Sequence, residues 1–160
     1  ENSEAGIFIV EKSEVEVSEN TCNSNMIGID FEKESKGKAV HNTCIENSEA
    51  GIFIVEKSEV EVSENTCNSN MIGIDFEKES KGKAVHNTCI ENSEAGIFIV
   101  EKSEVEVSGN TCNNNKVGIH FQDDARGSAY NNICRYNKTG VTKYKANDVV
   151  IGSNTVNNKQ

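Results

Sequence analysis

The sequence predicts an all-β protein, a single-stranded right-handed parallel β-helix (β-solenoid) of about seven coils with 22–23 residues each. The cysteines recur at alternating steps of 22 and 23 residues, and apolar and polar residues alternate with period two between Asn/Ser/Gly turns. Such a fixed period is typical of solenoids, and the alternation indicates strands. Leucine is absent, which argues against leucine-rich repeats of similar length.

The chain is built from a repeat of 45 residues. Residues 46–90 are identical to residues 1–45, and residues 91–108 repeat the start of the unit. Because 160 residues can bury one substantial core, we expect a single domain. Its expected parts are the two-coil repeats 1–45, 46–90 and 91–135 and a C-terminal coil over 136–160, which together make one domain over 1–160. Since natural duplications drift, the identical copies favour a segment multiplied in the laboratory, or a very recent duplication.

Equivalent positions of successive coils are expected to stack in columns along three short strands per coil. The inward columns of the first two coils are Ile7/Ile29, Ile9/Phe31, Val15/Gly37 and Val17/Ala39. Large residues of one coil face small residues of the next at Val15/Gly37, as interdigitated packing requires. We therefore expect a narrow apolar core.

All six cysteines fall in one inward column. They are Cys22, Cys44, Cys67, Cys89, Cys112 and Cys134. No Cys-x-x-Cys or Cys/His spacing suggests a tetrahedral metal site. We expect buried free thiols that pack as small apolar residues. Disulfides or thiol-bound metal between neighbouring coils remain as alternatives.

Two columns of asparagine flank the cysteine column. The first, two residues before each cysteine, is Asn20, Asn42, Asn65, Asn87, Asn110 and Asn132. The second, three residues after each cysteine, is Asn25, Asn47, Asn70, Asn92, Asn115 and Asn137. We expect the stacked amides to hydrogen-bond to each other and to the turn backbone, with ligand binding as the alternative.

Outward columns alternate in charge from coil to coil. One column begins Glu14, Lys36, Glu59, Lys81, and the column two residues later begins Glu16, Lys38, Glu61, Lys83. Opposite charges on paired strands attract, and a slip by one coil would place like charges together. The charges therefore favour one register, and they explain why the unit contains two coils.

The overall charge limits the classes of partner. A formal net charge of −10 argues against nucleic acid and against an anionic membrane surface. No apolar run approaches the roughly 20 residues of a membrane span. The sequence indicates no compartment.

One candidate ligand site lies in the diverged third copy. His120 occurs close to Asp123, Asp124 and Arg126. A histidine, two carboxylates and an arginine on adjacent strands could bind a glycan or a cation. An ordinary solvated face is the alternative.

An apolar stripe is expected on an outward face. Phe8, Phe53 and Phe98 share an outward column, interrupted by Asp30 and Asp75. Exposed apolar stripes often mark contacts between molecules, although local packing also accounts for them. Neither end of the sequence shows a cap, and open strand edges invite pairing. We expect self-association through the ends or through the Phe8/Phe53/Phe98 face.

The recurring pattern Gly-Ile-x-(Phe/Ile) … Asn-Thr-Cys-x-x-Asn resembles the right-handed parallel β-helix repeats of the carbohydrate-binding and sugar-hydrolase group, including pectate-lyase-like solenoids. The resemblance covers the whole chain. It implies the fold more than an activity, because relatives include polysaccharide lyases, epimerases and non-catalytic scaffolds. Lyases of this architecture use a calcium-binding Asp cluster with a basic residue, and the identical repeats contain no such cluster. No catalytic residue is therefore carried over.

Together these observations predict a structural repeat scaffold, designed or engineered, that is not an enzyme and has no cofactor or metal. The alternative is a polysaccharide-binding module derived from a β-helix protein, with a glycan as its partner.

Overall fold

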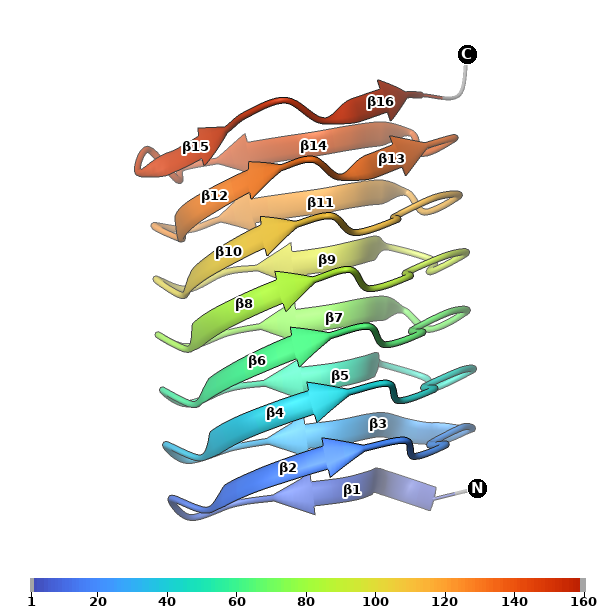
Figure 1. Ribbon diagram of the computed structural model, residues 1–160, viewed down its shortest axis with the longest axis vertical. Helices are drawn as coiled ribbons and strands as arrows, with labels where there is room; N and C mark the ends of the chain where they lie inside the picture. Colours follow the sequence, from blue (N-terminus) through green and yellow to red (C-terminus); the bar gives the residue numbers. More distant parts are fainter. Residues whose placement is uncertain (1, 159–160) are drawn as a thin grey trace.

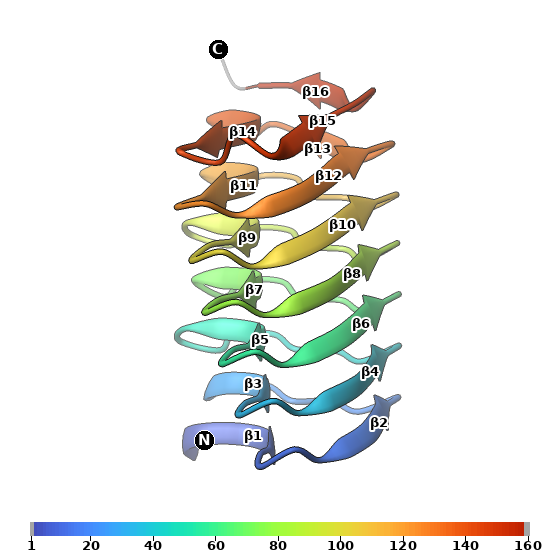
Figure 2. The same cartoon turned by 90° about the vertical axis from the view of Figure 1, so that its left-hand side faces the viewer.

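The computed structural model describes residues 2–158 and confirms the predicted fold class. The coils stack along one axis, and the two ends of the chain lie at opposite ends of the stack (Figures 1 and 2). All paired strands are parallel, as a solenoid requires. The described chain contains no helix that could span a membrane.

Two seven-stranded sheets form two sides of the solenoid. The first sheet contains β1 (Asn2–Ile9), β3 (Asn25–Phe31), β5 (Ala50–Ile54), β7 (Ile72–Phe76), β9 (Ala95–Ile99), β11 (Val117–Gln122) and β14 (Thr139–Tyr144). The second sheet contains β2 (Glu14–Ser18), β4 (Lys36–Val40), β6 (Glu59–Ser63), β8 (Lys81–Val85), β10 (Glu104–Ser108), β12 (Arg126–Tyr130) and β15 (Val149–Ile151).

The third side differs from the expected third strand. It is held by single bridges such as Thr21↔Thr43, and within residues 2–158 only β13 (Ile133–Arg135) and β16 (Thr155–Asn157) pair there as strands. Closely spaced asparagine corners leave little extended backbone on this side. The stacked asparagine side chains supply much of the bonding between coils there.

The register follows the spacing of 22 and 23 residues. Glu14 pairs with Lys36 and Val15 with Gly37, and Gly37 pairs in turn with Val60. Outward charges therefore alternate along the second sheet as predicted. The ion pair between Lys36 Nζ and Glu59 Oε2 measures 3.6 Å.

The core is apolar and continuous. Ile29, Ile52 and Phe76 are fully buried. Within a single coil, the large side chain of Phe76 packs against Gly82, which has no side chain. A Cβ atom added at Gly82 would lie 3.1 Å from Cε1 of Phe76. The same Cβ would lie 1.9 Å from the carbonyl oxygen of Val60 on the neighbouring strand. Glycine is therefore required by close approach of both a ring and a backbone.

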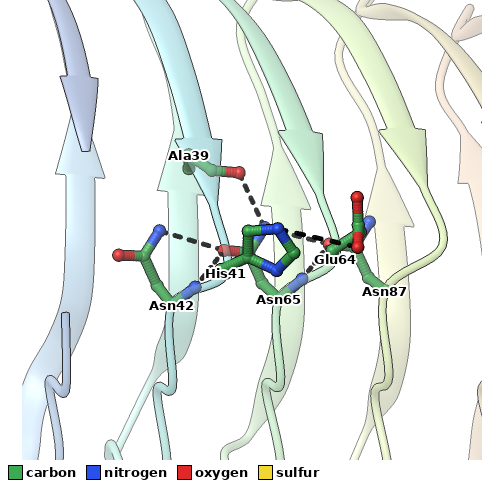
Figure 3. Close-up of polar contacts among 6 residues, drawn as sticks. All are labelled: Ala39, His41, Asn42, Glu64, Asn65 and Asn87. Atoms are coloured by element: carbon green, nitrogen blue, oxygen red, sulfur yellow. Dashed lines mark hydrogen bonds and ion pairs between the residues drawn. The ribbon is translucent and has the colours of Figure 1, made fainter. Parts of the chain in front are cut away.

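The asparagine columns form hydrogen-bonded ladders (Figure 3). Nδ2 of Asn42 donates to Oδ1 of Asn65 at 3.0 Å, and Oδ1 of Asn65 also accepts from the backbone N–H of Asn42 at 2.9 Å. Nδ2 of Asn65 donates to the carbonyl of Ala39 at 2.8 Å and to Oδ1 of Asn87 at 3.0 Å. These buried amides satisfy both their own polar atoms and the corner backbone.

The turns between the first and second sheets have an unusual backbone. Two successive residues have positive φ in all of these turns except the one between β14 and β15, for example Glu56 at 56° and Lys57 at 63°. This is the conformation of a type I′ turn, which normally favours Asn and Gly. Tight coils therefore impose it on charged side chains.

Candidate functional site

The outer face of the first sheet carries a column in which aromatic and acidic residues alternate. We call it the aromatic–acidic column, and its members are Phe8, Asp30, Phe53, Asp75, Phe98, His120 and Thr142. Successive members are directly paired on neighbouring parallel strands, so their side chains stand one above another.

Exposure differs sharply along this column. The side chain of Phe8 is 56% exposed, and Phe53 and Phe98 are half-buried. Asp30 and Asp75 are only 5% exposed. The carboxyl groups thus lie in a layer between rings, although their outward phase in the sequence suggested contact with solvent.

A second outward column lies beside the first. It contains Val10, Glu32, Val55, Glu77, Val100 and Gln122, two residues after the corresponding members of the aromatic–acidic column. Each buried aspartate therefore has a glutamate next to it on the same strand face. Burial, followed by Glu32, raises the pKa of Asp30 to about 7. Burial and Glu77 raise the pKa of Asp75 as well.

His120 is held from three sides. Its ring stacks on Phe98, with ring centroids 5.6 Å apart and an interplanar angle of 11°. Nδ1 lies 2.6 Å from Oγ1 of Thr142, and Nε2 lies 3.1 Å from Oε1 of Gln122. Nε2 of Gln122 donates to Oδ2 of Asp123 at 2.9 Å. Oε1 of Gln122 is thus an acceptor for a proton on Nε2 of His120.

The predicted patch of four residues is only partly assembled. His120 and Asp123 are joined through Gln122, and Asp124 is exposed in the turn. Arg126 lies on β12 in the second sheet and pairs with Asp148 at 3.7 Å. Arg126 therefore lies on a different side of the solenoid from His120, because the turn at Asp123 and Asp124 carries the chain onto the next side.

Three residues that contact His120 were not predicted from the sequence as members of this site: Phe98, Gln122 and Thr142. The 22-residue step links Phe98 to His120 and His120 to Thr142, so the spacing contained the signal. Gln122 follows from alternation, since it is two residues after His120.

Comparison with known proteins assigns the family. Residues 1–111 match the family model described as "Right handed beta helix region". This chain belongs to the right-handed β-helix family. Residues 76–160 also match the model described as "Periplasmic copper-binding protein (NosD)". Comparison with curated protein sequences gave no match.

Among solved structures, this β-helix is similar to the crystal structure of the periplasmic alginate epimerase AlgG. The TM-score is 0.84 at 17% sequence identity, and the match covers 99% of this chain and 44% of the epimerase chain. At this identity the likeness shows the fold, and the chain spans less than half the length of that protein.

This match corrects the prediction that the β-helix is not an enzyme. The similar structure is an enzyme, so the fold does not argue against catalysis. The sequence argument rested on the lack of one known type of Asp cluster in the repeats. That lack excludes one catalytic arrangement and leaves other chemistry open.

The second sheet of the β-helix presents a charged trough of about 760 Å³. Its floor includes Val60, Gly82 and Val105, and its walls are the alternating Glu and Lys columns. Lys83 and Glu106 form an ion pair at 3.5 Å across neighbouring coils. Because its charges largely compensate one another, this surface offers few free groups to a ligand.

The six cysteines are free and buried in one column. The hydrogen bond with Cys112, together with burial, raises the pKa of the Cys134 thiol above its ordinary value. Cys44 differs, because its hydrogen bonds with Cys22 and Cys67 lower its pKa to about 5 although burial opposes ionisation. The other thiols of the column are poor nucleophiles and poor metal ligands, because both roles require the thiolate. Within residues 2–158 no three His, Cys, Asp or Glu side chains are grouped so that they could hold a metal ion.

Proposed function

We propose that this β-helix binds an extended polysaccharide along the aromatic–acidic column. The observation that carries the proposal is the row of rings at Phe8, Phe53 and Phe98, one on every second strand. With strands about 4.8 Å apart, the rings recur about every 9.6 Å along the axis. An extended polysaccharide can therefore lay the apolar faces of its sugar rings on successive aromatic rings.

Polar groups at the edge of the column support the same ligand class. Glu32, Glu77 and Gln122 are half-buried beside the rings and can bond sugar hydroxyl groups. Apolar surface with a few convergent polar groups is typical of small-molecule and cofactor sites. Each of the two identical 45-residue repeats adds one phenylalanine and one aspartate to the column, so repetition lengthens the binding face.

The charge of the face favours a neutral polysaccharide. Four carboxyl groups line it in the first two repeats, at Asp30, Glu32, Asp75 and Glu77. The chain as a whole carries −10. An acidic polymer such as alginate would be repelled by this field.

The identity of residues 1–45 and 46–90 supports an engineered repeat scaffold, and binding by the face does not depend on that origin.

Copper binding, named in one matching family model, is not part of the proposal. The buried thiols and the scattered histidines do not fit a copper site in the described chain.

The test is thermal unfolding and affinity electrophoresis with a panel of neutral polysaccharides and polyuronates. A ligand that binds the folded chain raises its melting temperature. The variant Phe53→Ala/Phe98→Ala should weaken binding at least about tenfold, equivalent to about 1.4 kcal/mol. The control Lys38→Ala/Lys83→Ala changes residues with the same spacing on the second sheet and should bind as the parent does. Equal binding by both variants, or binding of polyuronates alone, would overturn the proposal.

A further inference from the structure

We propose that Asp30–Glu32 and Asp75–Glu77 are proton-sharing carboxyl pairs, each of which holds one proton between its two carboxyl groups. They would make the stability of the β-helix depend on pH in a range where ordinary carboxyl groups are already ionised.

The geometry of the first pair requires a proton. Asp30 lies in β3 and Glu32 directly follows the end of β3, so by alternation both are on the side opposite to Phe31. Phe8 and Phe53 lie on the strands below and above Asp30. Oδ1 of Asp30 is buried, and no donor within residues 2–158 reaches it. Leaving a buried carboxylate oxygen without a partner is costly, and a proton held between the two carboxyl groups removes that cost.

The second pair repeats this arrangement. Asp75 lies between Phe53 and Phe98, and Oδ1 of Asp75 likewise lacks a donor among the described residues. Glu77 lies between Val55 and Val100, which are both buried. The apolar neighbours above and below prevent water from replacing the missing donor.

The third repeat shows what these two positions do when no proton is needed. His120 and Gln122 replace the aspartate and the glutamate, and they are hydrogen-bonded to each other at 3.1 Å. An aspartate and a glutamate are both acceptors when ionised, so they can form the equivalent bond only if one of them is protonated. The same pair of positions is thus bridged in all three repeats.

The surrounding charges favour protonation. After burial, Glu32 and then Glu56 raise the pKa of Asp30. Glu77 and Glu101 act in the same way on Asp75. Burial and Glu101 also raise the pKa of Glu77, and Lys78 only partly opposes this. The neighbouring strands contribute Phe and Val side chains to these sites and no cation.

The sign of the effect on stability follows from proton uptake. An unfolded aspartate has a pKa of about 3.9, and the folded pKa of Asp30 is about 7. Between these values the folded chain binds more protons than the unfolded chain, so stability falls as pH rises from about 4 to about 7. Above that range this contribution no longer changes.

The decisive experiment is an NMR titration of the chain labelled with ¹³C at the aspartate carboxyl carbon. The sequence contains five aspartates, so the spectrum has five signals, and Asp30→Asn and Asp75→Asn assign two of them. We expect the Asp30 signal to titrate near pH 7 and the Asp75 signal well above the usual aspartate range. Midpoints near pH 4 for both would overturn the proposal.

Thermal unfolding between pH 5 and pH 8 gives a second measurement. In Asp30→Asn/Asp75→Asn each new amide donates to the adjacent glutamate, so the fall in melting temperature over this range should largely disappear. The control Glu61→Gln/Glu106→Gln removes two charges from the second sheet and should keep the parental fall. If Asp30→Asn/Asp75→Asn retained the parental fall in melting temperature, the result would contradict the carboxyl pairs. Both experiments use the free chain, so their outcome is separate from glycan binding.

Discussion

Phe76 lies against Gly82 within one coil, and the missing side chain of the glycine provides the space that the ring fills. The partner coils have Val60 at the glycine position and Ile54 at the ring position, so total core volume stays similar from coil to coil. The two-coil unit is thus a packing unit as well as a charge unit.

We predict that Gly82→Ala destabilises the chain by about 3 kcal/mol or more, because the new Cβ would overlap the carbonyl oxygen of Val60, a backbone atom. Adding Phe76→Ile should not restore stability, since the backbone contact remains. Gly152→Ala is the control, because the atom nearest to its new Cβ would be Cβ of Tyr130, at 3.3 Å. Chemical denaturation measures all three variants. A loss below 1 kcal/mol for Gly82→Ala would contradict the packing argument.

Replacing Asn65 by alanine should cost about 3 kcal/mol or more. The change removes two donated bonds and leaves the N–H and Nδ2 groups of Asn42 without their shared acceptor. Asn20→Ala is the matched control at the first rung, where the side chain is half-buried and accepts no bond from a preceding asparagine. Urea unfolding of the two variants should show the interior rung to be clearly more costly. Equal losses would mean that the ladder adds nothing beyond a local corner contact.

The double variant Glu56→Asn/Lys57→Gly should stabilise the chain by about 1 kcal/mol or more. Both residues have positive φ, a conformation that costs most side chains about 1–2 kcal/mol per residue, whereas Asn and Gly tolerate it. The reverse-order variant Glu56→Gly/Lys57→Asn should be close to it in stability, because both positions need the same backbone region. Differential scanning calorimetry checks the change, and a lowered melting temperature in both variants would show that the ion pairs of this turn matter more than its backbone.

Lys38→Glu should destabilise the chain by up to about 1 kcal/mol at low salt. Lys38 lies between Glu16 and Glu61 and forms a 4.0 Å ion pair with Glu61, so the variant places three like charges in a row. The loss should shrink in 1 M salt, where exposed charges are screened. Lys38→Gln, which removes the attraction without adding repulsion, should fall between the parent and Lys38→Glu. A salt-independent loss would point to packing of the lysine stem.

Much of the fold could be predicted from the sequence because a parallel solenoid places residues 22 or 23 apart in contact. The columns of Cys22 and Asn42 needed only this spacing. The single-bridge third side and the Phe76–Gly82 contact depend on how the chain bends at each corner, which spacing does not determine.

The candidate site was harder to predict. The alternation of residues along the strands places Asp30 and Asp75 on the outer face, which suggested contact with solvent. The structure shows that phenylalanine rings of the neighbouring coils bury them. Arg126 is close to His120 in sequence but lies on the second sheet, because a corner between the two sheets separates them. Residues on either side of a turn face different directions in this fold.

Along the asparagine ladder that begins at Asn20, every rung donates its side-chain amide in the same direction, from Asn20 to Asn42, from Asn42 to Asn65 and onward to Asn154. The amide dipoles of this ladder therefore point the same way, and their sum grows with the number of coils. Hydrogen bonds in such a series polarise one another. Inserting further 45-residue units should consequently raise the stability of each coil as well as the number of coils.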